Sequence, residues 1–195
     1  MNKHETLNMN HETQGNLLLS PHFRLSEFEA SRTAAEQGIA NVAPPEAVEN
    51  LRRLCEGCLE PLREALGRPI VITSGYRCQR LNEILVHAAR RSQHMVGCAA
   101  DFYVSSAGSR VQGSRVQGSR VQGSRVQGLS RRELLIEAFR TIILDEGIDY
   151  DQLIIYPSFI HVSYVSPTAN RHKLTKANGN GKYCALSRAD ALAIV

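Results

Sequence analysis

No apolar run in the sequence is long enough to cross a bilayer, because a membrane-spanning helix needs about 20 consecutive apolar residues. Residues 1–14 are polar and contain no apolar stretch of the kind found in a secretory signal peptide. The first absence predicts that the chain has no transmembrane segment. The second predicts synthesis in the cytoplasm without a signal peptide, which leaves export by another route open.

The five cysteines are an odd number, and without a secretory signal we expect them to be reduced thiols. Cys55 and Cys58 have the CxxC spacing of redox and metal sites, but the sequence contains no second CxxC. The pair also lies within an amphipathic helical pattern. We therefore predict that both are small core residues, with redox or metal chemistry as the alternative.

Acidic residues are absent from one segment, in which Gly108-Ser109-Arg110-Val111-Gln112 occurs four times without change. The formal net charge is +4, and the four arginines of this repeat account for all of it. The basic balance is therefore poor evidence of nucleic-acid binding, and we expect no nucleic-acid partner. The repeat is rich in Gly and Ser, which predicts a flexible insertion over residues 108–128 in a surface loop. The alternative is that its arginines bind an anionic polymer.

The rest of the sequence fits one domain of the α+β class. We divide the chain into a disordered tail (1–18), a domain (19–166) and a C-terminal extension (167–195), in which Lys182 to Leu186 could add an edge strand. The periodicity of apolar residues predicts the elements of the domain. They are helices over 44–67 (divided near Pro61), 79–90 and 130–147, and strands over 69–73, 102–104, 151–156 and 159–164.

An imidazole and a carboxylate lie close together just before the strand at 102–104. His94 and Asp101 have Gly97 between them, and a histidine in a loop and an aspartate entering a strand can converge on one ion. Zinc accepts N and O ligands, and a catalytic zinc usually takes three from the protein and leaves one position for water. His161, in the last predicted strand, is the best-placed third ligand. The alternative is that all three are ordinary surface or core side chains.

With these segments in place, the chain resembles the zinc D-Ala-D-Ala carboxypeptidase family of peptidoglycan-directed peptidases. Four segments carry the resemblance, and they occur in the family's order. They are His22 to Phe28, Ser74-Gly75-Tyr76-Arg77 with Leu81-Asn82, Ser92 to Asp101 with the SxHxxGxAxD zinc motif, and the strand pair Asp151 to Ile154 and Phe159 to Ser163.

The resemblance implies a hedgehog/DD-peptidase-like zinc fold, with a small, mostly antiparallel sheet and packed helices. It implies that His94, Asp101 and His161 bind one Zn²⁺. It further implies that Arg77 holds a carboxylate of the substrate, with Ser92 and Gln93 lining the substrate side.

The implied activity is hydrolysis of a peptide bond in the peptidoglycan stem peptide, by a D-Ala-D-Ala carboxypeptidase or an endopeptidase. Such an enzyme, which could be phage-derived, would act at the cell wall after export or lysis, and we expect a monomer. The alternative is a catalytically inactive, zinc-stabilised module that binds the cell wall.

The chain departs from the family at the expected general base, because residues 152–160 contain no Asp, Glu or His. Asp151 is the nearest acid, and we predict that it is the general base. The alternative is that it only caps the strand. Tyr156 is a weaker candidate, which would bind the oxyanion on the substrate side.

The length of the hairpin turn decides whether Asp151 faces the zinc. A two-residue turn pairs Tyr156 with Phe159 and places Gln152 on the face of His161, whereas a three-residue turn places Asp151 there. A proline at the first turn position has a fixed negative φ, which disfavours the tight primed turn. The sequence therefore favours the three-residue turn and Asp151.

Overall fold

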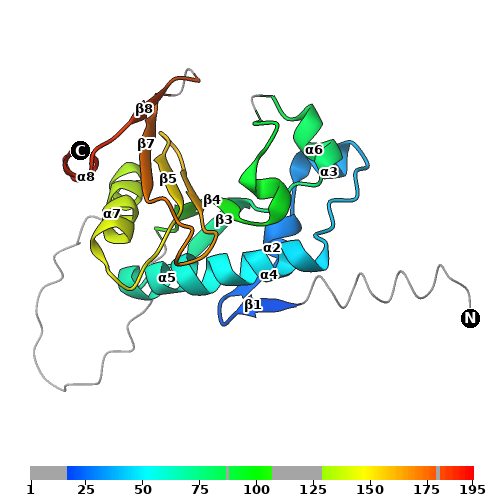
Figure 1. Ribbon diagram of the computed structural model, residues 1–195, viewed down its shortest axis with the longest axis horizontal. Coiled ribbons are helices and arrows are strands. Elements are labelled where there is room, and N and C mark those ends of the chain that lie inside the picture. Colours follow the sequence, from blue (N-terminus) through cyan, green and yellow to red (C-terminus); the bar gives the residue numbers. More distant parts are fainter. Residues whose placement is uncertain (1–16, 87, 107–128, 179–180) are drawn as a thin grey trace, which may run out of the picture.

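The computed structural model describes residues 17–86, 88–106, 129–178 and 181–195, and Figure 1 shows how they are arranged. Most of the tail predicted to be disordered (1–18) and all of the predicted flexible insertion (108–128) lie outside these residues. None of the helices in the described ranges is long and apolar enough to cross a membrane.

Two sheets form the scaffold. A small antiparallel sheet pairs β1 (Leu18–Ser20) with β2 (Phe23–Arg24). The main sheet has six strands in the order β3-β4-β6-β5-β7-β8, and all its neighbours are antiparallel except β5 and β7. Its strands are β3 (Ile70–Ser74), β4 (Ala99–Val104), β5 (Gln152–Ile155), β6 (Ile160–Ser163), β7 (Lys173–Ala177) and β8 (Tyr183–Ala185). The predicted α+β class with a mostly antiparallel sheet is confirmed.

The helices surround the main sheet. They are α2 (Leu25–Glu29), α3 (Arg32–Glu36), α4 (Pro45–Leu54), α5 (Glu60–Leu66), α6 (Gln79–Ile84), α7 (Arg131–Leu144) and α8 (Arg188–Leu192), with a π-helical turn η1 (Cys55–Leu59) and a 3₁₀ turn η2 (Gln93–Val96). The turn η1 joins α4 to α5, so the long predicted helix is divided just before Pro61. Cys55 and Cys58 are fully buried free thiols, as predicted for core residues, and burial raises the pKa of both.

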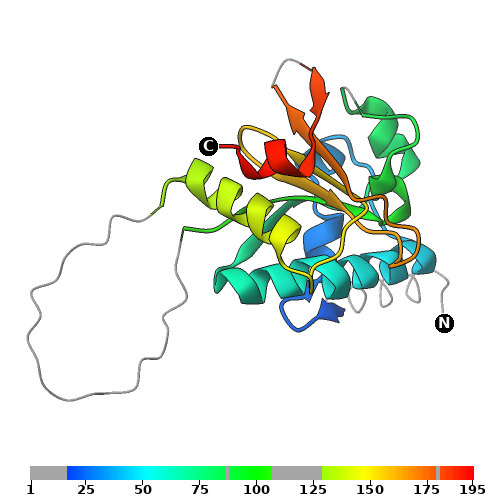
Figure 2. The same ribbon diagram turned by 60° about the vertical axis from the view of Figure 1, so that its left-hand side comes forward.

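The central strands β5 and β6 have one face toward the core and one toward the site. Ile160 and Val162 on β6 and their partners Ile155 and Leu153 on β5 are buried in the core. Figures 1 and 2 show α5 and α7 packed on the sheet, away from α6. Because side chains alternate along a strand, His161 lies on the opposite face from Ile160 and Val162.

Two segments differ from the predicted element pattern. The helix predicted over 79–90 ends at Ile84, and Leu85 has an extended backbone. The Asn82 amide donates to the Ala89 carbonyl, which holds the following residues in a turn instead of a helix. Residues 167–195, set apart as an extension, contribute β7, β8 and α8 to the same body, and β8 is the edge strand expected near Lys182 to Leu186.

Candidate metal centre and its cavity

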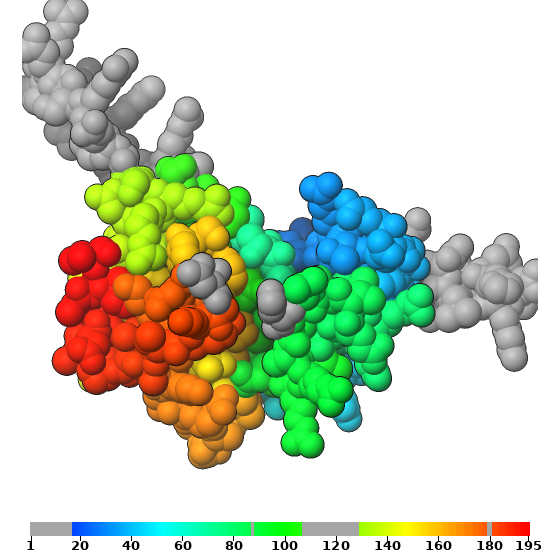
Figure 3. All heavy atoms as spheres, turned by 90° about the horizontal axis from the view of Figure 1, so that it is seen from above, coloured from blue at the N-terminus to red at the C-terminus, as the bar shows by residue number. Residues whose placement is uncertain are grey.

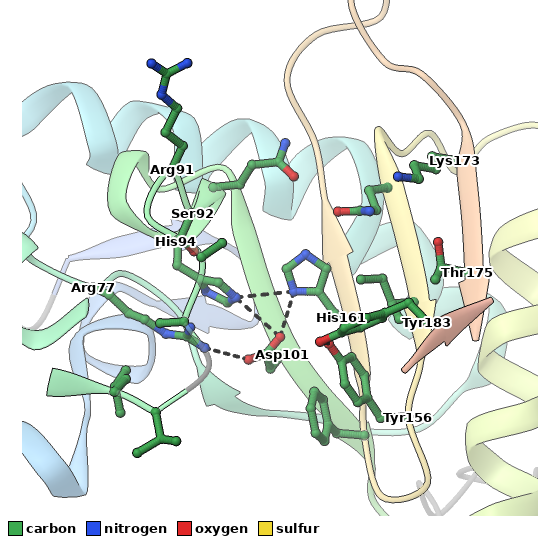
Figure 4. Close-up of a pocket in the computed structure, with 18 residues that line it drawn as sticks. Arg77, Arg91, Ser92, His94, Asp101, Tyr156, His161, Lys173, Thr175 and Tyr183 are labelled. Carbon is green, nitrogen blue, oxygen red and sulfur yellow. Dashed lines mark hydrogen bonds and ion pairs between the residues drawn. The ribbon is translucent and has the colours of Figure 1, made fainter. Parts of the chain in front are cut away.

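Three elements bring the predicted zinc ligands together. Asp101 on β4 and His161 on β6 are directly opposite partners in the antiparallel pair, so their side chains share one face. His94 comes from η2, the 3₁₀ turn that precedes β4. Figure 4 shows the two imidazoles and the carboxylate directed toward one another. The structure therefore assembles the three residues that the sequence proposed as ligands.

Two of the three donor-atom separations match those of a tetrahedral zinc site, and the third is shorter. His94 Nε2 lies 3.3 Å from His161 Nδ1 and 3.4 Å from Asp101 Oδ1, and His161 Nδ1 lies 2.8 Å from the same oxygen. Ligands about 2.0–2.1 Å from a tetrahedral zinc are about 3.3 Å apart. Two imidazoles and a carboxylate are also a donor set that zinc accepts, so the residues present fit the ion.

Contacts behind the ligands fix their orientation. The Gly75 carbonyl lies 2.7 Å from His94 Nδ1, and a proton on that nitrogen leaves Nε2 free to bind a metal. Burial lowers the pKa of His94, despite the opposing effect of Asp101, which favours the neutral imidazole. Burial alone would raise the pKa of Asp101, but the His94 and His161 rings hold it well below its usual range. Both residues are therefore in the protonation state that a metal requires.

Gly97 ends η2 between His94 and Asp101, where a side chain would be strained. Its φ is +73°, and an added Cβ would collide with the backbone of Ala47 on α4. We expect Gly97→Ala to lower the free energy of unfolding by about 3 kcal/mol or more. Gly38→Ala is the matched control, because Gly38 has φ +61° but open space around it, so about 1 kcal/mol is expected. Urea denaturation measures both, and equal losses would contradict the collision.

The three proposed ligands line a cavity of about 630 Å³, a size typical of ligand sites. Figure 3 shows it as a recess between the orange and red C-terminal segments and the green segment that carries α6 and η2. Seven of the eight predicted site residues line it, namely Arg77, Ser92, Gln93, His94, Asp101, Tyr156 and His161.

Arg77 is already bound within the site. Its Nη2 donates to Asp101 Oδ2 at 2.8 Å, and its Nε donates to the Ser74 hydroxyl at 3.0 Å. The guanidinium therefore holds the carboxylate of Asp101 through Oδ2, the oxygen that does not face the two histidines. The predicted contact of Arg77 with a substrate carboxylate stays a prediction.

Tyr156 is fixed by two aromatic neighbours. Its ring stacks on Phe159, with centroids 4.2 Å apart, and its hydroxyl lies 3.2 Å from that of Tyr183 on β8. Burial, followed by the neighbouring Tyr183 hydroxyl, raises the pKa of Tyr156. The phenol is therefore protonated at neutral pH and can donate a hydrogen bond into the cavity.

The expected three-residue hairpin turn is wrong. Tyr156 N donates to the Phe159 carbonyl at 3.0 Å, and Ile154 is the partner of His161, so the turn has two residues and Gln152 lies on the face of His161. In this register Tyr156 stacks on Phe159, and cross-strand aromatic pairs stabilise hairpins. The register argument for Asp151 as general base therefore fails.

Asp151 has a different set of contacts. It is 1% exposed and does not line the cavity. Arg171 binds both of its oxygens, through Nε at 2.7 Å and Nη2 at 2.6 Å, and Gln93 Nε2 and the Ser163 hydroxyl donate to Oδ2. Burial would raise the pKa of Asp151, but hydrogen bonds from Arg171 and Gln93 lower it to about 2. Its role as a base stays an untested prediction.

Sequence reasoning did not identify Arg171, Lys173, Thr175 or Tyr183, which lie at the site or support it. All four belong to the segment that we had set apart as an extension. Residues 171–177 show no regular alternation of polar and apolar residues, and the parallel pairing of β7 with β5 has no local sequence signature.

Comparison with known proteins identifies a peptidase family for most of the predicted domain. The family model described as Peptidase M15 matches residues 21–133, more than half of the chain. The match includes His94 and Asp101, whereas His161 lies beyond it and joins the site through β6. No curated protein matches the chain significantly.

Proposed function

The chain belongs to the peptidase M15 family, and from this premise we propose that it is a zinc-dependent peptidase that hydrolyses peptide bonds of the peptidoglycan stem peptide, as a carboxypeptidase or an endopeptidase. The observation that carries the proposal is the triangle of His94, Asp101 and His161 donor atoms at the floor of an open cavity. We place its action at the cell wall, after export or lysis.

The chain's own residues divide the work around the ion. A bound zinc ion would supply activation of water and polarisation of the scissile carbonyl group. Arg77 orients Asp101 through a hydrogen bond to Oδ2, while the Gly75 carbonyl fixes the His94 ring. The Tyr156 hydroxyl can donate a hydrogen bond to the carbonyl oxygen as negative charge develops on it.

A second candidate function is a zinc-stabilised module that binds the cell wall without turnover. One observation favours it. In the described part of the chain, which omits position 87, the cavity wall holds no carboxylate or imidazole besides the three proposed ligands. A peptidase needs a group that takes a proton from water and passes it to the leaving amine.

Hydrolysis with and without metal separates the two functions. We expect the protein to cleave purified peptidoglycan or a D-Ala-D-Ala stem peptide, to lose activity on chelation and to regain it with added zinc. Product masses by mass spectrometry identify the bond and so separate carboxypeptidase from endopeptidase. Stoichiometric zinc with no cleavage of either substrate would favour the binding module, and cleavage that survives complete chelation would contradict the metal mechanism.

A further inference from the structure

We infer that the cavity contains a second subsite, on β5 and β7, which binds a carboxylate of the peptide substrate with Lys173 as its charged group. This inference rests on the proposed function, because it adds a substrate feature to the same cavity. Figure 4 shows Lys173 and Thr175 on β7, on the other side of His161 from Arg77. The subsite is therefore separate from Arg77, which binds the carboxylate of Asp101.

Strand register directs this part of β7 into the cavity. In the parallel pair of β5 and β7, Lys173 is the partner of Gln152, and Thr175 is the partner of Ile154. Ile154 is also the partner of His161 across the β5–β6 pair. Since residues two apart on a strand share a face, all five side chains lie on the face of the metal centre, and all five line the cavity.

The charges of the cavity wall are unbalanced. Among the described residues, Asp101 is its only acid, and Arg77 occupies one oxygen of that acid. Neither Lys173 nor Arg91, the other two cations of the wall, has an ion pair within the described part of the chain. Arg171, two residues before Lys173, is in contrast bound to a buried acid. The ammonium of Lys173 is thus available to an anionic group of a ligand.

A hydroxyl beside Lys173 also lacks a partner. Thr175 is 4% exposed, and its Oγ1 makes no hydrogen bond to any described residue. Buried polar groups are ordinarily paired, so the Thr175 hydroxyl has unused hydrogen-bonding capacity beside Lys173. The hydroxyl is covered in its present rotamer, so it would contact a ligand only after rotation about the Cα–Cβ bond.

The segment after α6 lines the cavity with apolar side chains, in contrast to the polar side chains of β7. Leu85, Val86, Ala88 and Ala89, which follow α6, line the cavity there. An extended peptide across the metal centre would lay a small apolar side chain on this wall and a polar group against β7. A carboxylate suits the β7 side because it can accept hydrogen bonds from both the Lys173 ammonium and the Thr175 hydroxyl. The substrate class is therefore a peptide with a free carboxylate close to the scissile bond.

Binding to the chelated full-length protein tests the subsite without turnover. A fluorescent stem peptide with all carboxylates free is compared by anisotropy with analogues in which one carboxylate at a time is a carboxamide. We expect one analogue to bind about tenfold more weakly than the parent peptide, the order expected for loss of one hydrogen bond to a charged group. Lys173→Gln should remove that difference. Lys176→Gln should keep it, because Lys176 lies on the same strand but does not line this cavity.

The outcomes separate the subsite from the proposed function. A wild-type protein that binds all the peptides equally, or a Lys173→Gln variant that keeps the tenfold difference, overturns the subsite. Hydrolysis by the zinc-loaded protein is measured in parallel with the same peptides. Hydrolysis without a carboxylate preference contradicts only the subsite, whereas a preference that depends on Lys173, without any hydrolysis, upholds the subsite and contradicts the peptidase.

Discussion

Replacing His94 by Ala is expected to abolish stoichiometric zinc binding and to lower peptidase activity by about 10³-fold or more. His94 supplies one of three donor atoms, and its ring is 3% exposed and fixed by the Gly75 carbonyl. Two remaining ligands make a poor zinc site, because zinc is held by three or four protein ligands. Loss of the ion removes several kcal/mol of transition-state stabilisation, and each 1.4 kcal/mol is a factor of ten in rate.

Two measurements check this result. Zinc content after dialysis should fall from one ion per chain to almost none in His94→Ala and should stay at one in His172→Ala, whose ring is exposed and pairs with Asp149. Added zinc should raise the unfolding temperature of the wild type but not of His94→Ala, because a ligand stabilises only the state that binds it. An unchanged zinc content in His94→Ala would exclude the proposed metal centre.

Features set by local rules were predictable from the sequence. The helix predicted from residue 130 begins with the S-x-x-E pattern of a capping box: the Ser130 hydroxyl accepts from the Glu133 amide, and the Glu133 carboxylate accepts from the Ser130 amide. Gly67 ends α5 with φ +57°, as expected of a helix-terminal glycine. The placement of His161 required only the alternation of side chains along a strand, because its predicted strand was correct.

The features that were missed depend on interactions that a local pattern of residue types does not reveal. At the hairpin, the turn length expected from Pro157 was wrong, and Tyr156 stacks on Phe159 in the two-residue turn that forms instead. The pairing of β7 with β5 was equally hidden, because a parallel pair has no turn signal. The consequence is that one wall of the cavity, with Lys173 and Thr175, could not be predicted from the sequence.

The contacts of Asp151 connect this unpredicted wall to the metal centre. Arg171 comes from the segment that leads into β7, and Gln93 is the residue before the ligand His94. Asp151 joins them, with Gln93 Nε2 at 2.8 Å and Arg171 Nη2 at 2.6 Å from the same oxygen. We therefore assign Asp151 a positioning role, in which it holds η2 against the sheet.

Asp151→Asn is accordingly expected to lower the free energy of unfolding by about 2–3 kcal/mol, because a charge-assisted pair is lost and a buried amide group then faces donors. Glu36→Gln is the matched control, since its ion pair with Arg32 is exposed and about 0.5 kcal/mol or less is expected. The substitution also weakens the hydrogen bond that holds Gln93, the residue before the ligand His94. We expect zinc binding to be weaker by about tenfold as a result. Urea denaturation and a competitive zinc chelator measure the two effects.

The stability difference between the wild type and Asp151→Asn should depend on pH. The pKa of Asp151 is about 2 in the folded protein, below the value of about 3.9 in an unfolded chain. Its contribution is therefore fully present above about pH 5 and declines as the pH falls from about 4 toward 2, so the wild type should approach the variant over that interval. An Asp151→Asn variant that keeps its stability and zinc affinity but loses hydrolysis would instead restore Asp151 as the general base.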